Sequence, residues 1–320
     1  MSESPKIQSI IDPDTKTFGL ALGSGGARGL AHVGFLQKMY ELGFRPQCIS
    51  GTSMGALVGA IYAGGDMDAF TKWLLELGPA DFFRFIDLTF PKHGLIDCTD
   101  LMDELEQFLH VQNIEDCRTP LAIVASNGIT GEEVILTSGN ILEAIRAAIT
   151  LPGIIVPPMY NGEPLLDGGM VNPVPVSVAR EMGAEVVYAV DVSAGLLSGR
   201  KRRNGENNKQ ARAAAMRAFL KENMMNFADY LGPAKFAAGE LVSHLLDSDP
   251  EPENISIFEA IMNSLSISQQ ALKEIQYKQY PPDALLTPDL SHMLLLDFHK
   301  AESAIEKGKE CAQGFFSSFL

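Results

Sequence analysis

Apolar runs alternate with helical patterns along the first 195 residues of the chain. "FGLALG" (18–23) and "LAIVAS" (121–126) carry no charge, which predicts buried strands, and "LAHVGFLQKMYELG" (30–43) predicts a helix ending at a glycine. Apolar strands that alternate with helices favour an α/β fold, with a mostly parallel sheet between layers of helices. The predicted strands are 18–23, 46–50, 121–126, 133–137 and 185–192, and the predicted helices are 30–43, 54–63, 140–149 and 174–184.

The pattern changes after Val192. Residues 198–210 predict a polar, basic loop, either solvated or in contact with lipid headgroups. Two apolar stripes at helical spacing follow, which predict a helical C-terminal half whose stripes pack in the core. We therefore expect an N-terminal extension (1–16) and one domain (17–320), in which residues 211–280 form a helical lid or cover. The stripes are Leu220, Met224, Phe227 and Leu231, and then Phe258, Ile261, Leu265, Ser268, Leu272 and Ile275, with Ser268 as the one polar member.

Composition narrows the range of partners. The chain has 320 residues and 46% hydrophobic side chains, enough for a large core, and a net charge of −15. That charge argues against nucleic acid as a partner and against binding anionic membranes through bulk charge. The four cysteines show no C-x-x-C spacing and no histidine in metal-ligand register, which indicates reduced structural thiols and no metal site.

An uncharged stretch from Pro46 to Gly65 has roughly the length of a membrane span. It begins with proline and contains several polar residues and five glycines, which favours a buried strand followed by a tightly packed helix. The N-terminus has neither a basic start nor an apolar core, so no signal peptide is expected. We expect a cytoplasmic protein.

The same stretch contains "GTSMG" (51–55), a G-x-S-x-G pattern between a predicted strand and a predicted helix. A sharp strand-to-helix turn exposes a serine hydroxyl at the end of the strand, above the amides that open the helix. Those amides favour negative charge on a reaction intermediate. The context points to Ser53 as a nucleophile, and the alternative is a structural glycine turn.

The glycine-rich segment "GSGGARG" (23–29) also lies between a strand and a helix. Successive backbone N–H groups in such a loop can serve as an oxyanion hole. A dinucleotide-binding loop is the alternative, but Arg28 stands where its third glycine is needed. No acidic residue follows at 48–50 to hold a ribose.

Asp167 is the strongest candidate for the base, since it leaves an apolar segment and precedes two glycines in "LLDGGMVNPVP" (165–175). A histidine base would require a Ser–Asp–His order, which His244, His292 and His299 formally allow. None of these three lies in a glycine-rich loop after a strong strand, and His32 reads as a packed core residue.

Three segments together resemble the patatin-like phospholipases, and among them the bacterial relatives of the neuropathy target esterase branch. They correspond, in the same order, to the glycine-rich, G-x-S-x-G and D-G-G/A blocks of that family. The resemblance covers about residues 17–195 closely and 285–311 more loosely, including segments 144–158 and 289–310. The three segments are "GSGGARGLAHVGFL", "GTSMGALVGAIYAGG" and "DGGMVNPVPVSVAREMGAEVV".

The resemblance implies a three-layer α/β/α patatin-like fold and a Ser–Asp dyad that needs no histidine. Carried over to this chain, Ser53 is the nucleophile and Asp167 the base. The oxyanion hole is formed by the amides of Gly25, Gly26 and Ala27.

Two further positions of the glycine-rich loop bear on the resemblance. Arg28 matches the family pattern, and we expect it to brace the loop by hydrogen bonds. Ser24 stands where the family usually has glycine, which affects the expected local geometry of the loop.

The implied activity is a serine acyl hydrolase that cleaves fatty-acyl esters of (lyso)phospholipids or similar lipids. It needs neither a metal nor a cofactor and works without calcium. Its partner is a lipid or acyl-ester substrate, met through peripheral membrane contact. The alternatives are an acyl-thioesterase or acyltransferase with the same dyad, and a non-catalytic lipid-binding regulator. An intact Ser53, Asp167 and glycine loop argue against the regulator.

Overall fold

The structure is a computed structural model that describes residues 18–77, 97–194 and 257–320. The chain divides into two compact units, one of residues 1–196 with 267–320 and one of residues 197–266. Everything that follows on sheet and site concerns the first unit. The predicted extension, the basic loop, the first apolar stripe and the part of the predicted cover before residue 257 lie outside the described residues. The boundaries of the predicted domain stay a prediction.

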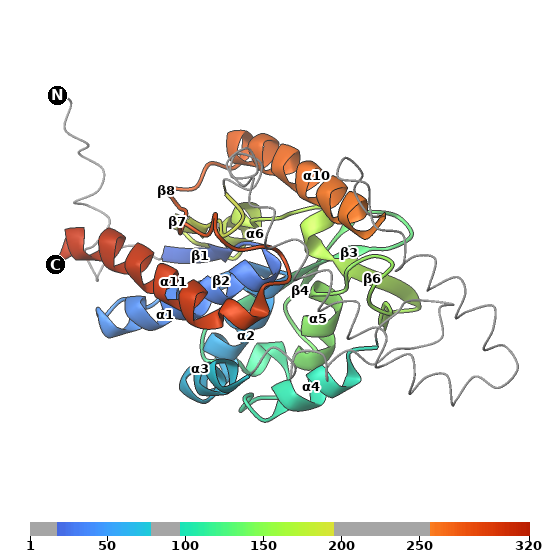
Figure 1. Ribbon diagram of the computed structural model, residues 1–320, viewed down its shortest axis with the longest axis horizontal. Helices are drawn as coiled ribbons and strands as arrows, with labels where there is room; N and C mark the ends of the chain where they lie inside the picture. The colour runs from blue at the N-terminus through green and yellow to red at the C-terminus, as the bar shows by residue number, and fades with distance from the viewer. Residues whose placement is uncertain (1–17, 78–96, 195–256) are drawn as a thin grey trace, which may run out of the picture. The chain divides into compact units, whose positions relative to one another are not determined.

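The strands of the first unit form one sheet in the order β5-β6-β3-β2-β1-β7-β8, with β4 also paired to β3 (Figure 1). Strands β3, β2, β1, β7 and β8 run parallel to one another, whereas β4 and β6 pair antiparallel with β3. The predicted mostly parallel sheet is confirmed. The strands are β1 (Phe18–Leu22), β2 (Cys48–Thr52), β3 (Leu121–Asn127), β4 (Glu133–Leu136), β5 (Met159–Tyr160), β6 (Glu163–Asp167), β7 (Val186–Val190) and β8 (Ala284–Leu286).

Strand β3 brings the ends of β2 and β6 together. Thr52 of β2 pairs with Val124 of β3, and Asp167 of β6 pairs with the next residue, Ala125. Strand β4 pairs with residues 123–126 of β3 and overlaps both partners, so it must occupy the opposite edge. Strands β2 and β6 therefore meet end to end along one edge of β3. The residues that follow β2 and the residues that follow β6 therefore begin beside each other.

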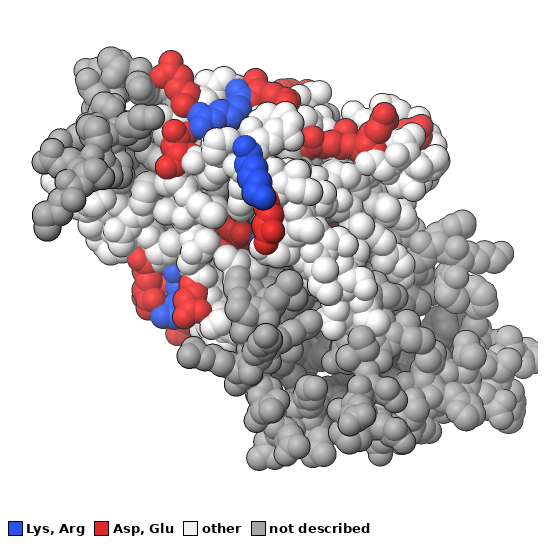
Figure 2. All heavy atoms as spheres, turned by 90° about the horizontal axis from the view of Figure 1, so that it is seen from above, with Lys and Arg blue, Asp and Glu red and all other residues white. Residues whose placement is uncertain are grey.

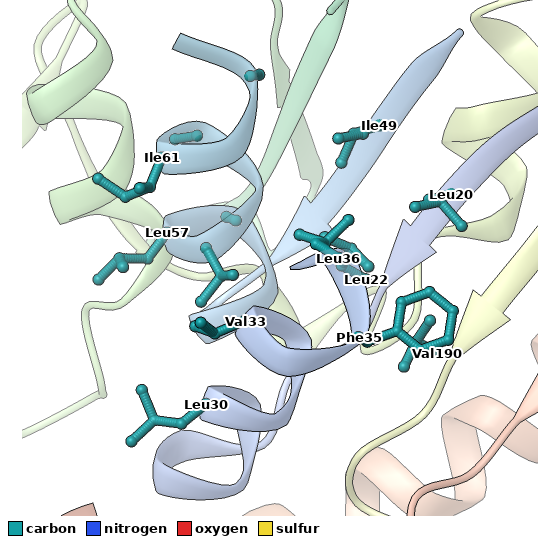
Figure 3. Packing of buried hydrophobic residues seen from close by; sticks show 14 of the residues in the cluster. Leu20, Leu22, Leu30, Val33, Phe35, Leu36, Ile49, Leu57, Ile61 and Val190 are labelled. Atoms are coloured by element: carbon teal, nitrogen blue, oxygen red, sulfur yellow. The ribbon is translucent and has the colours of Figure 1, made fainter. Parts of the chain in front are cut away.

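Helices cover both faces of the sheet (Figure 1). Leu20 and Leu22 of β1 face the large apolar cluster shared with α1, α2, α5 and α11, as Figure 3 shows for part of it. Ala21 faces the other side, where it packs with residues of α6. This alternation along a buried strand confirms the three-layer α/β/α arrangement. The α-helices are α1 (Ala31–Glu41), α2 (Met54–Gly64), α3 (Met67–Glu76), α4 (Thr99–Glu106), α5 (Ile141–Ala148), α6 (Val176–Glu181), α10 (Ile257–Gln279) and α11 (Ala301–Phe316).

Two glycines let the last helix lie directly on the first. A methyl group on Gly34 of α1 would be 1.8 Å from the Ile305 carbonyl oxygen, and one on Gly308 of α11 would be 1.9 Å from the Ala31 carbonyl oxygen. Such close backbone approach is possible only without a β-carbon. Because α11 lies on α1, the segment before α11 lies beside the glycine-rich loop that precedes α1.

Residues 46–65 form the predicted strand, turn and helix, since β2 ends at Thr52 and α2 begins at Met54. None of the helices in the described part of the chain is both long and apolar enough to cross a bilayer. The pattern missed β5, β6 and β8, which have at most five residues each. It also missed a 3-10 helix, η1 (Gly26–Leu30), that precedes α1.

The apolar stripe predicted for α10 is wrong for the part of the helix that belongs to the first unit. Ile275 is 60% exposed and Ser268 is exposed too, whereas Lys273 is 1% exposed. Lys273 is buried because its ammonium group meets the Asp191 carboxylate at 2.8 Å. Polar contacts decide which face of this helix is buried, and hydrophobic periodicity cannot reveal them.

Candidate active site

Ser53 is the single residue between β2 and α2, and its backbone has φ 56° and ψ −125°. A residue with a β-carbon rarely adopts this conformation. The two flanking glycines make room for it. A methyl group on Gly55 would lie 2.2 Å from the Leu22 carbonyl oxygen, and one on Gly51 would lie 2.6 Å from the Gly55 carbonyl oxygen. The G-x-S-x-G spacing therefore lets α2 start directly against β1.

The Ser53 hydroxyl donates a hydrogen bond to Oδ2 of Asp167 at 2.6 Å. The other carboxylate oxygen, Oδ1, accepts the Gly169 backbone N–H at 2.7 Å. Both side chains are shielded, with 7% of Ser53 and 2% of Asp167 exposed. Gly168 allows this turn to sit close to β3, since a methyl group there would be 2.3 Å from the Val124 carbonyl oxygen. A hydroxyl and a carboxylate in this contact can exchange a proton.

Burial raises the pKa of the Asp167 carboxyl from 3.8 to about 6, against the lowering effect of hydrogen bonds from Ser53 and Gly169. Desolvation disfavours the charged carboxylate, so the buried group holds a proton more strongly than an exposed aspartate does. A stronger proton acceptor is a better general base near neutral pH. Burial therefore makes Asp167 a stronger base than a solvent-exposed aspartate.

The glycine-rich loop offers two backbone donors. Neither the Gly25 nor the Gly26 amide donates a hydrogen bond to any residue that the structure describes. Gly26 has φ 54°, and a methyl group on it would lie 2.5 Å from the Leu295 carbonyl oxygen, so glycine is required there. Met54, at the start of α2, packs on Gly29 of the same loop, and its amide likewise has no acceptor among the described residues. Sequence reasoning did not include Met54, although the residue after a nucleophilic serine is a common oxyanion donor.

The expectation for Ala27 needs correction. Its amide donates to the Leu295 carbonyl oxygen at 2.8 Å, so it is engaged within the protein and cannot also serve an oxyanion in this conformation. The acceptor comes from the segment before α11, more than 260 positions away. Sequence patterns do not reveal such a contact.

Arg28 ties the loop to the same segment. Its Nε and Nη2 donate to the Met293 carbonyl oxygen at 2.9 and 2.7 Å, and the side chain is 4% exposed. His32 supports the loop from below, with Nε2 2.8 Å from the Gly23 carbonyl oxygen. Burial lowers the pKa of His32 to about 4, so its ring is neutral. A neutral, buried ring matches the packed core residue expected from its place in the helix.

Histidine is absent from the groups that the structure describes around Asp167. The carboxylate contacts Ser53 and Gly169, and His292 contacts the Ser303 hydroxyl at 2.9 Å. His93 and His244 lie outside the described residues. The geometry therefore favours the dyad over the Ser–Asp–His arrangement that the sequence left open.

A buried polar cluster behind the glycine-rich loop was not predicted. Lys273 donates to both carboxylate oxygens of Asp191 at 2.8 and 3.1 Å and to the Ser193 hydroxyl at 2.8 Å. The Tyr277 hydroxyl donates to Asp191 at 3.2 Å. Between Asp191 and Ser193, Val192 packs on the loop, since a methyl group on Gly25 would be 2.5 Å from its Cγ2. The cluster thus connects α10 to the glycine-rich loop.

The chain is similar to known proteins, first of all through a family match. The family described as "Patatin-like phospholipase" matches residues 20–180, which include both Ser53 and Asp167. An uncharacterized NTE family protein of Mycobacterium tuberculosis is 28% identical, over 94% of this chain and 91% of that protein.

Longer proteins match in part. Lysophospholipase NTE1 of Mycosarcoma maydis is 36% identical over 55% of this chain and 10% of its own length. Patatin-like phospholipase domain-containing protein 7 of mouse is 34% identical over 54% of this chain and 13% of its own. The crystal structure of VipD from Legionella pneumophila has a TM-score of 0.41 at 14% identity, covering 96% of this chain and 67% of that chain, too low a similarity to carry an argument.

Proposed function

Because this chain belongs to the patatin-like phospholipase family and is a lipid ester hydrolase, we propose that Ser53 and Asp167 are its catalytic dyad and that a monoacyl phospholipid or similar ester is its substrate. One observation carries the assignment of the dyad. The Ser53 hydroxyl and the Asp167 carboxylate are in direct hydrogen-bond contact at 2.6 Å, on a strained turn and shielded from water.

In the first half of the reaction, Oγ of Ser53 attacks the carbonyl carbon of the ester while its proton passes to Oδ2 of Asp167. The carbonyl oxygen becomes an oxyanion that accepts hydrogen bonds from the Gly25 and Gly26 amides, with the Met54 amide as a third donor. The bond between the carbonyl carbon and the alcohol oxygen then breaks. The proton on Asp167 moves to that oxygen, so the alcohol leaves neutral and Ser53 carries the acyl group.

In the second half, a water molecule replaces the alcohol. Asp167 takes one proton from this water, and the water oxygen attacks the acyl carbonyl carbon. When the intermediate collapses, Oγ of Ser53 leaves and recovers the proton from Asp167. The products are a fatty acid and the free enzyme, and each proton that Asp167 accepts is returned within the same half-reaction.

The substrate assignment is supported by the family and by the charge of the protein. A relative carries the name lysophospholipase. A long acyl chain excludes water from a site that needs to stay dry, and it contributes about 0.8 kcal/mol for each methylene buried. The face in Figure 2 shows acidic and basic side chains side by side, without a broad basic patch among the described residues. Because the protein has a net charge of −15, which disfavours anionic surfaces, we propose that it contacts zwitterionic micelles or bilayers peripherally.

The test is fatty-acid release from lysophosphatidylcholine micelles by purified protein, together with labelling by a fluorophosphonate probe. We expect the wild-type protein to release fatty acid and to be labelled, and Ser53→Ala to do neither. Release from the lysophospholipid by Ser53→Ala at the wild-type rate would exclude the dyad. A wild-type protein that is labelled but releases no fatty acid would exclude the proposed substrate.

A further inference from the structure

Asp191, the residue directly after β7, has a carboxylate that is surrounded by donors. Its Oδ1 accepts hydrogen bonds from the backbone N–H and the hydroxyl of Ser193 at 3.0 and 2.8 Å, and from the Lys273 ammonium group at 3.1 Å. Its Oδ2 accepts Lys273 at 2.8 Å and the Tyr277 hydroxyl at 3.2 Å. Together these contacts fix the turn formed by residues 191–193.

The ion pair is suited to holding a position rather than to adding stability. The side chains of Lys273 and Asp191 are only 2% and 4% exposed, and taking two charges out of water offsets much of their attraction. Charge-assisted hydrogen bonds are short and directional, so they fix geometry. Helix α10 is itself held nearby, since Gln276 donates to the Val171 carbonyl oxygen at 2.8 Å. The ammonium group therefore approaches Asp191 from a fixed support.

The turn and the strand end before it contact the glycine-rich loop at two points. The carbonyl oxygen of Val190, the last residue of β7, accepts the Gly23 backbone N–H at 3.0 Å. Val192 lies in the middle of the turn, is buried, and packs its Cγ2 against Gly25, where even a methyl group would be 2.5 Å from it. The side chain of Val192 thus joins the turn to a residue that we propose as an oxyanion donor.

The contact with Val192 bears on the direction of the Gly25 N–H. This group belongs to the planar peptide between the Cα atoms of Ser24 and Gly25, so its direction is set where the two ends are held. The Ser24 amide donates to the Pro173 carbonyl oxygen at 2.8 Å, which holds one end, and Val192 packs against the other. Glycine restricts its own backbone little, so the direction of its N–H depends on these neighbours.

We propose that Asp191 and Lys273 are positioning residues of the oxyanion hole, and that they act through Val192 on the Gly25 amide. Neither charged side chain contacts the substrate. Donors that are aimed in advance at the oxyanion need no reorganisation when negative charge develops on it. All three residues lie outside the segment 20–180 that the family match covers. This proposal rests on the proposed function and adds what keeps its oxyanion hole in shape.

The first experiment removes the contact and leaves the ion pair in place. Val192→Ala deletes both γ-methyl groups, and we expect kcat for a p-nitrophenyl ester to fall about tenfold while KM changes less than about twofold, because the donor serves the transition state. Val187→Ala is the matched control, since Val187 is a fully buried valine of β7 that packs on the opposite face of the sheet. It should lose similar stability and keep kcat within about twofold.

A second variant tests the ion pair itself. Lys273→Met combined with Asp191→Asn removes both charges together, and kcat should fall as it does in Val192→Ala. Adding Val192→Ala to this pair should lower kcat less than it does in the wild-type protein, since both changes act on one contact. Hydrogen exchange of the backbone amides of residues 23–27, measured by mass spectrometry, should be faster in both variants than in Val187→Ala.

The outcomes separate the two proposals. If Val192→Ala keeps kcat, or if Val187→Ala lowers it equally, Val192 has only a packing role and the positioning proposal is wrong. A wild-type protein that neither hydrolyses the ester nor reacts with a fluorophosphonate would exclude the proposed function. Hydrogen exchange needs no substrate and decides in that case whether the ion pair holds the loop. Circular dichroism shows whether each variant is folded, and the Lys273→Met, Asp191→Asn variant decides alone if Val192→Ala is not.

Discussion

The Ser53 hydroxyl donates a hydrogen bond to Oδ2 of Asp167 at 2.6 Å, although 114 positions separate the two residues in the chain. The contact exists because β2 and β6 end against each other on the same edge of β3, one parallel and the other antiparallel to it. The backbone of one sheet therefore fixes the positions of Ser53 and Asp167, the proposed nucleophile and base. A site built on sheet ends needs little reorganisation when a substrate binds.

Replacing Ser53 should separate activity from stability. Ser53→Ala removes the nucleophile, and we expect kcat/KM for a p-nitrophenyl ester to fall by at least about a thousandfold. Ser53→Gly should be equally inactive but more stable than Ser53→Ala by about 1 kcal/mol, because glycine adopts a φ of 56° without strain. Urea denaturation of the two inactive variants measures this difference. Equal stability would show that the turn stores no strain.

Asp167→Asn should be as damaging as Ser53→Ala, since an amide cannot accept the serine proton. His292→Ala and His299→Ala should each keep wild-type kcat/KM within a few fold, as neither side chain is among the described contacts of the dyad. The same activity assay, with circular dichroism as a check on folding, measures all three variants. Loss of activity in a folded histidine variant would restore the Ser–Asp–His hypothesis.

The raised pKa of Asp167 predicts a pH profile for activity. Protonated Asp167 cannot act as a base, so kcat/KM should fall about tenfold for each pH unit below about 6 and level off above it. The measurement is kcat/KM from pH 4.5 to 8 in buffers of constant ionic strength. A profile that stays flat down to pH 5 would mean that the carboxyl is not desolvated in the working enzyme.

The same shift predicts how stability depends on pH. The folded-state pKa of about 6 lies above the ordinary aspartate pKa of 3.8, so between these values the folded protein binds more protons than the unfolded chain. The contribution of Asp167 to the free energy of unfolding is therefore present below about pH 4 and lost as the pH rises through 6, by up to about 3 kcal/mol. The free energy of unfolding of Asp167→Asn should fall less over this pH interval than that of the wild-type protein. Urea titrations of both proteins at pH 4.5 and 7 measure the difference.

Breaking the buried pair of α10 should be costly. Lys273→Met leaves the Asp191 carboxylate buried without its cation, and we expect the free energy of unfolding to fall by about 3–5 kcal/mol. The double variant with Asp191→Asn should recover much of this loss. Lys72→Met is the control, because its side chain is 77% exposed beside Glu76, and it should change stability by less than about 0.5 kcal/mol. A loss for Lys273→Met as small as the control's would show that α10 is not anchored there.

The acyl-chain length that the enzyme prefers tests whether its substrate is a lipid, independently of the roles proposed for Ser53 and Asp167. Values of kcat/KM on p-nitrophenyl esters should rise steeply from acetyl to about ten carbons, since each methylene that leaves water contributes about 0.8 kcal/mol at most. Acetyl ester as the best substrate would leave a small-ester hydrolase on this scaffold.

The sequence alone determined the local parts of this protein. The strand, turn and helix around Ser53, the glycine-rich loop and the turn after Asp167 each depend on a few contiguous residues. These features can be recognised locally, because a sharp turn or a close backbone approach requires glycine at that position of the sequence itself. The family could therefore be identified from three short segments in order, and the mostly parallel sheet followed from apolar strands alternating with helices.

How those parts meet depends on contacts between distant segments of the folded chain. A short strand such as β6 pairs parallel or antiparallel with the same side chains, so its place beside β2 could not be read from residues 163–167. The engagement of the Ala27 amide by Leu295 and the burial of Lys273 against Asp191 depend on partners that lie far apart in the sequence. Polar contacts of this kind have no periodicity. They form where the folded chain places a donor against an acceptor.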